Sequence, residues 1–398
     1  MKIVNNLPIV IFVLVLCAMI IAALTNHSES TDEEQAPVAV QTRLKITEGS
    51  DWPMFRGEQR LLGRASGTLP DSLELVWKFR TDGSIKSSPV IVDDRVFVGS
   101  SDANVYSIDL ETGHQIWSYK TDDAVEATPC VVNGAVFIGS LGNILYALDA
   151  NIGTLKWKYQ TEGKILGAAN WTYAPDGSNV WILIGSYDNT LHCVDSKNGE
   201  AVWTYQTDNY INGSPAVDNN IAVFGGCDAL IHAISLANGS KITEIDTGSF
   251  IAASPAFLNG QVYVGNYEDV FVKADIITNQ IVWKYTDSNA PFFSSPAVGD
   301  NVVVIGGRDQ YLHCIDRNIG IMLWKFQTLG EVDSSPVICG DKVIVGSEDG
   351  RIYMVRLLDG TKVWSYEIGQ PVTSSPAVAK GAVVIGCDDG YVYAFGAR

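Results

Sequence analysis

Apolar and polar residues alternate along most of the chain in short runs that end at turn residues. One repeat contains four such runs, at residues 85–93, 95–100, 105–109 and 115–119. Alternation with a period of two is typical of half-buried strands, and a polar turn such as residues 101–104 between two runs indicates a hairpin. The pattern therefore predicts four antiparallel strands in each repeat.

The repeat has a period of about 40 residues. Tryptophans in the fourth run lie 40, 40, 46, 80, 41 and 40 residues apart, and Thr243 stands at the midpoint of the longest gap. Such a period with several strands per repeat is typical of a β-propeller. We therefore predict an all-β fold, an eight-bladed β-propeller of four-stranded antiparallel blades over residues 51–398. The repeat tryptophans are Trp77, Trp117, Trp157, Trp203, Trp283, Trp324 and Trp364.

The two ends of the repeat region complement each other. Residues 73–79 form a tryptophan-type strand with no earlier strands of its own, and residues 372–395 supply three strands without a fourth. We expect the N-terminal outer strand to pair with residues 391–395 and complete the last blade. Such closure removes open sheet edges.

Residues 1–24 differ in kind from the rest of the chain. Lys2 precedes an uncharged apolar run at residues 9–24, and acidic residues follow it. Such a segment is a signal peptide or an N-terminal membrane anchor, and Cys17 leaves a lipoprotein signal as a third alternative. Residues 25–50 are polar without periodicity, and we expect a flexible tether. The chain is therefore predicted to be exported and membrane-anchored, facing the periplasm or the cell exterior.

Charge and composition narrow the class of partner. The chain carries 45 acidic and 27 basic residues, a net charge of −18. This balance argues against nucleic acid and anionic membrane surfaces as partners. The simplest interpretation of it is a soluble acidic surface.

The cysteines and histidines recur at repeat positions. None of the seven cysteines is adjacent to another, and Cys193 and Cys314 occupy the same place in two repeats, next to His192 and His313; His232 lies on the equivalent strand of another repeat. We expect strand and core residues here, and neither disulfides nor metal ligands. Common nucleophile, zinc and phosphate-loop motifs are absent from the sequence. The prediction is no metal site and no cofactor.

The repeated residues suit structural roles. A tryptophan such as Trp117 can lie over the neighbouring blade with its N–H on a carbonyl group. Gly113 before it provides a turn with positive φ, and Asp109 can accept hydrogen bonds from the turn amides. An active site would break the symmetry of the repeat, so we assign these residues no catalytic role.

The run Asp-x-x-Thr-Gly-x-x-x-Trp at residues 109–117, present in about eight copies with Ser-Pro strands, resembles the PQQ-like (quinoprotein-type) β-propeller repeat. Residues 51–57 also resemble the start of that family, so the likeness covers 51–398. The family includes quinone-dependent dehydrogenases and non-catalytic, BamB-like scaffolds of outer-membrane protein assembly. In size and blade count this chain is nearer to the scaffolds. The dehydrogenases are longer and carry adjacent cysteines, which this chain lacks.

Two rings of residues are expected at one face of the propeller, around the channel. Their chemistry varies while the framework repeats, and loops on a rigid scaffold often carry binding; ordinary solvated turns are the alternative. The first ring, two residues before each Ser-Pro serine, holds Lys86, Glu126, Gly167, Asn212, Ala252, Phe293, Asp333 and Thr373. The second ring, in hairpin turns, holds Ser101, Leu141, Tyr187, Cys227, Tyr267, Arg308, Glu348 and Asp388. The predicted binding residues are Lys86, Glu126, Asn212, Phe293, Asp333, Thr373, Tyr187, Tyr267, Arg308 and Glu348.

The third repeat is irregular because it contains an insertion. This insertion is too short to close the channel, and the sequence contains no longer one. Residues 171–179 add about six residues to the third repeat, and we expect an extended first hairpin on the face opposite the two rings. The channel itself is expected to be open to water. Because water screens charges, we expect the pKa of a base in the channel to stay near its usual value.

These features favour a non-catalytic, exported and membrane-tethered scaffold. Its expected partners are proteins in the cell envelope or a cell-envelope polymer, and BamB-like outer-membrane protein assembly is the specific role that the resemblance implies. We expect one propeller within a larger complex. The alternative is a quinone (PQQ)-binding oxidoreductase or sensor, which would need a pocket for the cofactor on the channel axis.

Overall fold

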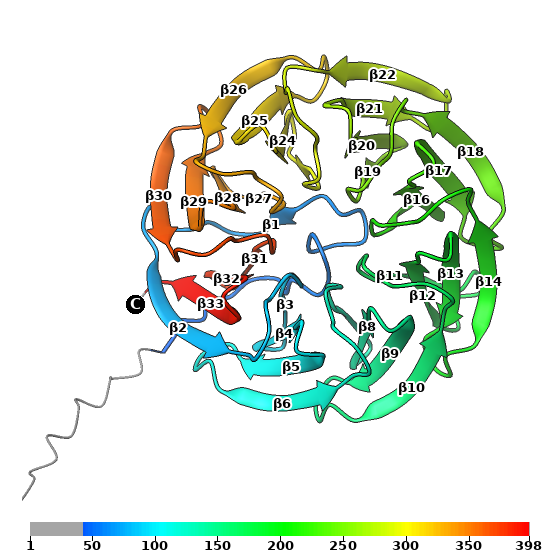
Figure 1. Cartoon of the computed structure of the whole chain (residues 1–398), viewed down its shortest axis with the longest axis horizontal. Helices are drawn as coiled ribbons and strands as arrows, with labels where there is room; N and C mark the ends of the chain where they lie inside the picture. The colour runs from blue at the N-terminus through cyan, green and yellow to red at the C-terminus, as the bar shows by residue number, and fades with distance from the viewer. Residues whose placement is uncertain (1–42, 398) are drawn as a thin grey trace, which may run out of the picture. The chain divides into compact units, whose positions relative to one another are not determined.

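Eight β-sheets arranged around a central channel make up the computed structural model, which describes residues 43–397 (Figure 1). All secondary-structure elements of these residues are strands, β1 to β33. The predicted all-β, eight-bladed β-propeller of four-stranded antiparallel blades is confirmed. Within the described residues, no helix is long and apolar enough to cross a bilayer.

Each blade takes its strands in order from the channel outward. Blade 1 contains β3 (Val90–Val92), β4 (Arg95–Gly99), β5 (Asn104–Asp109) and β6 (Gln115–Lys120). Blade 2 contains β7 (Cys130–Val132), β8 (Ala135–Gly139), β9 (Ile144–Asp149) and β10 (Leu155–Gln160). Blade 3 contains β11 (Asn170–Tyr173), β12 (Val180–Gly185), β13 (Thr190–Asp195) and β14 (Ala201–Gln206). Blade 4 contains β15 (Ala216–Asp218), β16 (Ile221–Gly225), β17 (Leu230–Ser235) and β18 (Lys241–Asp246).

The second half of the ring repeats this order. Blade 5 contains β19 (Ala256–Leu258), β20 (Gln261–Gly265), β21 (Phe271–Asp275) and β22 (Gln280–Tyr285). Blade 6 contains β23 (Ala297–Val298), β24 (Val302–Gly307), β25 (Tyr311–Asp316) and β26 (Met322–Gln327). Blade 7 contains β27 (Val337–Cys339), β28 (Lys342–Gly346), β29 (Arg351–Arg356) and β30 (Lys362–Glu367), with β1 (Arg64–Ala65) as a fifth, parallel strand on β27. Blade 8 contains β31 (Ala377–Ala379), β32 (Ala382–Gly386), β33 (Tyr391–Gly396) and β2 (Glu74–Arg80).

The ring closes as predicted. Strand β2 pairs antiparallel with β33, with Trp77 opposite Ala394, so the last blade takes its outer strand from the start of the propeller. The innermost strands are shorter than predicted. The first run was expected over residues 85–93, whereas β3 begins after Pro89. The reason is that the residues before the proline bond to neighbouring blades instead of to their own sheet.

The repeat tryptophans pack on the next blade. Six indole N–H groups donate to a carbonyl oxygen there at 2.8–3.2 Å, from Trp77, Trp117, Trp157, Trp203, Trp283 and Trp324. The turn glycine of that next blade lies under the indole. A Cβ atom at Gly153, for example, would lie 2.6 Å from Trp117. The tryptophans therefore join neighbouring blades. Glycine is needed at these turns for two reasons, the positive φ and the close approach of the indole ring.

The N-terminal segment crosses the channel, so the expectation that no segment closes it is wrong. Residues 52–63 form backbone hydrogen bonds with the inner strands of six blades, through Ile91, Val131, Val217, Phe257, Val298 and Ile338 in that order. Figure 1 shows this segment, in blue, at the centre of the ring. Residues 58–60 line a cleft with the first-hairpin turn of blade 4, so the segment lies toward the end of the channel away from the two predicted rings.

The structure bears on part of the predicted tether, residues 25–50. Residues 1–42, which include the predicted signal or anchor at 1–24, lie outside the described residues. Leu44 is 2% exposed and belongs to the core cluster of blades 7, 8 and 1. Its N–H donates to the carbonyl of Glu111 at 2.9 Å, and Thr47 bonds in the same way to Lys380. The packed part of the chain therefore begins before residue 51.

The irregular third repeat forms the expected hairpin. Strands β11 and β12 pair with Tyr173 opposite Val180, and the added residues form its tip. Residues 172–175 line the same cleft as residues 58–60, away from the two rings. The third repeat also lacks the Ser-Pro pair, which the regular repeats carry before the insertion point. The N–H of Ala168 bonds to the Ser214 hydroxyl, as the serine amides of the regular repeats do, so Ala168-Ala169 replaces Ser-Pro.

Candidate functional site

The two predicted rings surround the same mouth of the channel. Every second-ring residue donates its backbone N–H to a carbonyl in the connection that enters the inner strand of the same blade. These carbonyls define a third ring, which sequence analysis did not consider. The eight donor–acceptor pairs are Ser101–Ser84, Leu141–Ala124, Tyr187–Lys164, Cys227–Tyr210, Tyr267–Phe250, Arg308–Pro291, Glu348–Glu331 and Asp388–Pro371.

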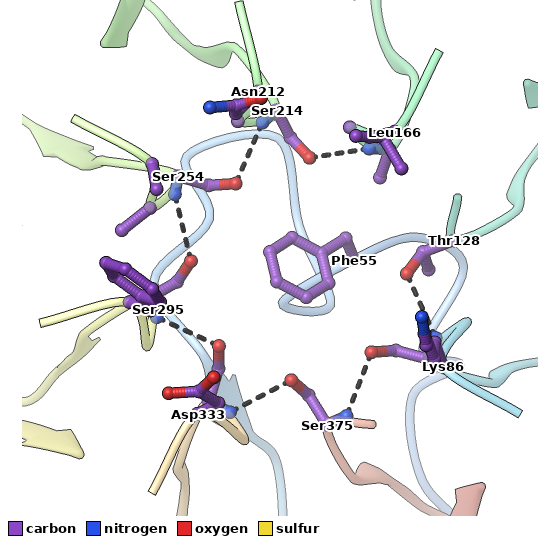
Figure 2. Close-up of a pocket in the computed structure, with 18 of the residues that line it drawn as sticks. Phe55, Lys86, Thr128, Leu166, Asn212, Ser214, Ser254, Ser295, Asp333 and Ser375 are labelled. Carbon is purple, nitrogen blue, oxygen red and sulfur yellow. Dashed lines mark hydrogen bonds between the residues drawn. The ribbon is translucent and has the colours of Figure 1, made fainter. Parts of the chain in front are cut away.

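A ladder of hydroxyl groups joins the blades below the mouth (Figure 2). The backbone N–H of each repeat serine donates to the hydroxyl of the next blade, for example Ser295 to Ser335 at 2.9 Å and Ser375 to Ser88 at 3.0 Å. Blade 3 has Ala168 at this position and offers no hydroxyl to Thr128, so the ladder is interrupted there. Because Ala168 stands at the serine position, Leu166, two residues before it, takes the first-ring place that was predicted for Gly167, and that prediction was wrong by one residue.

The first ring lines a small central pocket of ≈ 200 Å³. It brings together six predicted residues: Lys86, Glu126, Asn212, Phe293, Asp333 and Thr373. Phe55 of the N-terminal segment lies in the middle of them, as Figure 2 shows. Sequence analysis missed Phe55. The available signal was an aromatic-rich run, residues 52–55, without strand partners of its own.

Arg308 connects the two rings electrostatically. Its guanidinium donates to both carboxylate oxygens of Asp333, at 2.9 and 2.6 Å, and its Nε lies 3.2 Å from Glu331. The hydrogen bond to Asp333 raises the pKa of Arg308 above its usual value. The guanidinium also lies 3.7 Å from the centre of the Phe293 ring, a cation–π contact. Arg308 is therefore fixed by its partners.

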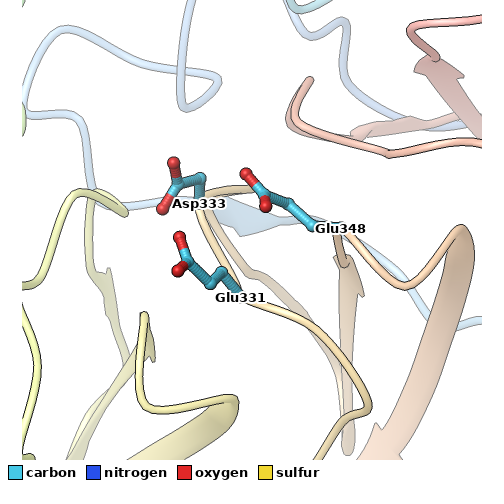
Figure 3. A group of neighbouring side chains, drawn as sticks. All are labelled: Glu331, Asp333 and Glu348. Atoms are coloured by element: carbon cyan, nitrogen blue, oxygen red, sulfur yellow. The ribbon is translucent and has the colours of Figure 1, made fainter.

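Three carboxylates gather on blade 7. Glu331, Asp333 and Glu348 each offer an oxygen within 4.8 Å of the others, so they form a group that could hold a metal ion (Figure 3). Burial, together with the charges of Asp333 and Glu331, raises the pKa of Glu348. Because Arg308 already binds two of the three, a cation would compete with its guanidinium.

Aromatic side chains gather on blades 3 to 6. Tyr187 stacks on Tyr210 with ring centres 4.8 Å apart and an angle of 5°. The ring centre of Tyr267 lies 4.5 Å from that of Phe293 and 6.3 Å from that of Phe250. Tyr187 and Tyr267 were predicted from the second ring, whereas Tyr210 and Phe250 belong to the third.

The remaining polar residues of the mouth hold one another. Lys86 pairs with Glu126 at 2.9 Å. The Thr373 hydroxyl donates to Asp388 at 3.1 Å. The Asn212 amide lies 3.0 Å from the Cys227 sulfur, and its oxygen is buried without a hydrogen-bond partner. An unsatisfied acceptor at a pocket wall can take a donor from a ligand.

The cysteines and histidines have the expected structural surroundings. The six described cysteines are free, and five of them are buried. His313 is fully buried between Asp309 and Tyr285, and burial lowers its pKa. His192 and His232 have equivalent aspartate and tyrosine partners. Their recurrence reflects strand packing.

The ring of eight blades and the repeated Asp-to-Trp turn define an eight-bladed PQQ-like β-propeller. The family described as "Beta-alanine-activating enzyme, beta-propeller" matches residues 171–398, more than half of the chain, and this chain belongs to that propeller family. A second family, described as "Outer membrane protein assembly factor BamB", matches residues 64–175. The predicted family resemblance is confirmed. Comparison with curated proteins gave no match.

This chain shares its fold with solved structures of a BamB protein and of two dehydrogenases. BamB from Moraxella catarrhalis is 19% identical with a TM-score of 0.68, over 82% of this chain and 100% of that one. Quinohemoprotein alcohol dehydrogenase from Comamonas testosteroni is 15% identical with a TM-score of 0.71, over 87% and 81%. A europium-containing methanol dehydrogenase is 13% identical with a TM-score of 0.73, over 88% and 98%. At these identities the likeness concerns the fold.

The central pocket does not fit the quinone cofactor of the dehydrogenase relatives. Its volume of ≈ 200 Å³ is below the roughly 300–1,000 Å³ of typical small-molecule sites. The Phe55 side chain is part of the lining of this pocket and lies near the centre of the ring of side chains in Figure 2. The carboxylates nearest the axis are engaged by Arg308 and Lys86.

Proposed function

We propose that this chain is a non-catalytic scaffold that binds a protein partner at the channel mouth. The observation that carries this proposal is Phe55, which fills the axis of the propeller and leaves ≈ 200 Å³. A channel filled in this way leaves the mouth as a shallow surface and not as the entrance to an enclosed site. Aromatic residues and arginine, which are enriched at protein interfaces, surround it.

The proposed cellular setting rests on the sequence. The apolar run at residues 9–24 supports export and membrane anchoring, with the propeller outside the cytoplasm. The family match to BamB supports a role for the propeller within a multiprotein complex of the cell envelope, with outer-membrane protein assembly as the specific proposal.

Site-specific photo-crosslinking tests the proposed surface. A photoreactive amino acid in place of Tyr267 or Tyr210 should give a discrete protein adduct in the native membrane fraction. The same amino acid in place of Ile116, which is exposed on the outer strand β6, should give none. Adducts at Ile116 alone would refute the mouth as the binding surface.

The alternative is a quinone-binding oxidoreductase, which the fold of the two dehydrogenases favours. Purified protein supplied with quinone, calcium and a dye acceptor should show no turnover of alcohols or sugars. Turnover that disappears in an Asp333→Asn or Glu126→Gln variant would overturn the scaffold proposal in favour of this alternative.

A further inference from the structure

One side of the mouth carries two neighbouring groups of aromatic side chains, the Tyr187–Tyr210 stack and the Phe250–Tyr267–Phe293 cluster. We call Tyr187, Tyr210, Phe250, Tyr267 and Phe293 the aromatic arc. Tyr210 is 47% exposed, Phe250 51% and Tyr267 39%. Large exposed aromatic groups in contact with one another mark interaction surfaces more often than single exposed residues do.

The aromatic arc is held in place before any partner arrives. Tyr187 is fixed by its parallel stack on Tyr210, and Phe293 by Tyr267 and the Arg308 guanidinium. The short turns that present these side chains are joined by backbone hydrogen bonds, such as Tyr267 N–H to Phe250 O at 2.9 Å. A rigid surface loses little conformational entropy on binding.

The other side of the mouth is acidic. We call Glu331, Asp333, Glu348 and Asp388 the acidic arc. Arg308 joins the two arcs, because it lies over Phe293 and binds Asp333. Arg308 pairs with Glu331 and Asp333, whereas Glu348 and Asp388 form no ion pair within the described residues, and burial together with neighbouring carboxylates raises the pKa of both. A cation placed there would relieve this repulsion.

These features together select the occupant. We infer that the mouth binds a basic polypeptide segment in which an aromatic or large apolar side chain packs on the aromatic arc while a neighbouring lysine or arginine reaches the acidic arc. Charge complementarity supports this choice, and the net charge of −18 for the whole chain would speed the approach of a basic partner. A neutral glycan could donate hydrogen bonds to these carboxylates, but it would gain no net attraction from their charge.

The inference deepens the proposed function and rests on it. The experiment uses the full-length protein and three labelled heptapeptides that share a Gly-Ser frame around Lys-Trp-Lys, Lys-Ala-Lys or Glu-Trp-Glu. Fluorescence anisotropy should show that the Lys-Trp-Lys peptide binds at least about tenfold more tightly than either of the others. Its affinity should fall as salt rises, because the charges of the mouth are partly exposed.

Variants of the two arcs assign the binding to this surface. Tyr267→Ala should weaken binding of the Lys-Trp-Lys peptide more than binding of the Lys-Ala-Lys peptide. Glu348→Gln should reduce the difference in affinity between the Lys-Trp-Lys and Glu-Trp-Glu peptides. Tyr173→Ala is the matched aromatic control, since Tyr173 is 59% exposed on the hairpin away from the mouth and should leave binding unchanged.

Two outcomes would overturn the inference. One is equal affinity for the Lys-Trp-Lys and Glu-Trp-Glu peptides, and the other is a neutral oligosaccharide that binds at Tyr267 while no peptide does. Photo-crosslinking at Tyr267 and Tyr210 tests the scaffold proposal separately from the proposal of a basic segment. An adduct at the mouth together with charge-blind peptide binding would retain the scaffold and reject the basic segment.

Discussion

The indole N–H of Trp77 donates to the carbonyl oxygen of Leu110 at 2.8 Å, and this bond joins the last blade of the propeller to the first. Trp77 comes from the closing strand β2 and is 8% exposed. Gly113 of blade 1 lies directly against its ring. A single side chain thus spans the point where the two ends of the propeller meet.

Truncation of Trp77 should therefore be costly. We expect Trp77→Ala to lower the free energy of unfolding by about 3–5 kcal/mol, because it leaves a cavity at the closure and an unpaired carbonyl. Trp77→Phe should lose less, since an aromatic ring remains. Urea unfolding followed by fluorescence measures both, and an unchanged midpoint for Trp77→Ala would show that closure does not depend on this contact.

Two glycines with the same backbone separate conformation from packing. Gly134 and Gly153 both have a φ of 71°. A Cβ at Gly134 would meet nothing within 4 Å, whereas at Gly153 it would lie 2.6 Å from Trp117. We expect Gly134→Ala to cost about 1–2 kcal/mol for the left-handed conformation, and Gly153→Ala a further 1–3 kcal/mol for the clash. Equal costs in thermal unfolding would contradict the packing role.

The N-terminal segment should contribute to stability in proportion to what it contacts. Deleting residues 1–42 should leave the melting temperature of the propeller unchanged. Deleting residues 1–65 removes Leu44, Trp52 and the backbone bonds to six blades, and should lower it by several degrees. Differential scanning calorimetry compares the two. If the longer deletion melts like the shorter one, the segment is dispensable.

Glu348 should make stability depend on pH in a defined direction. Its pKa is raised by burial and by Asp333 and Glu331, with Arg308 opposing and Asp388 adding to the effect. The penalty for its charge is present in full above the raised pKa and disappears as pH falls to the unfolded value of about 4.3.

Glu348→Gln should therefore be slightly more stable than the wild type at pH 7, by less than about 1 kcal/mol because the group is partly exposed. This advantage should shrink on acidification through the window between the raised pKa and about 4.3. Chemical unfolding at pH 7 and pH 4 provides the comparison. A stability difference that grows toward acid pH would contradict the sign of the shift.

The repeat explains how much of the molecule could be predicted. Trp77 and the closure followed from counting strands in a pattern seen many times, and Lys86 and Asp333 were placed at the mouth because equivalent positions share a direction. Gly167 was misplaced by one residue because Ala168-Ala169 stands in place of the Ser-Pro marker in its repeat, so the position could not be read from that marker. Phe55 was missed because it has no repeat counterpart and its position depends on contacts with distant blades.

The N-terminal segment bonds to blades 1, 2, 4, 5, 6 and 7, and β2 pairs with β33, the last strand of the chain. The partners of the N-terminal segment are therefore synthesised one after another along the whole chain, and the partner of β2 is synthesised last. The ring cannot close until the C-terminal strand exists, so closure follows elongation of the chain. A nascent chain of this protein carries its closing strand β2 unpaired for nearly the whole time that it is being made.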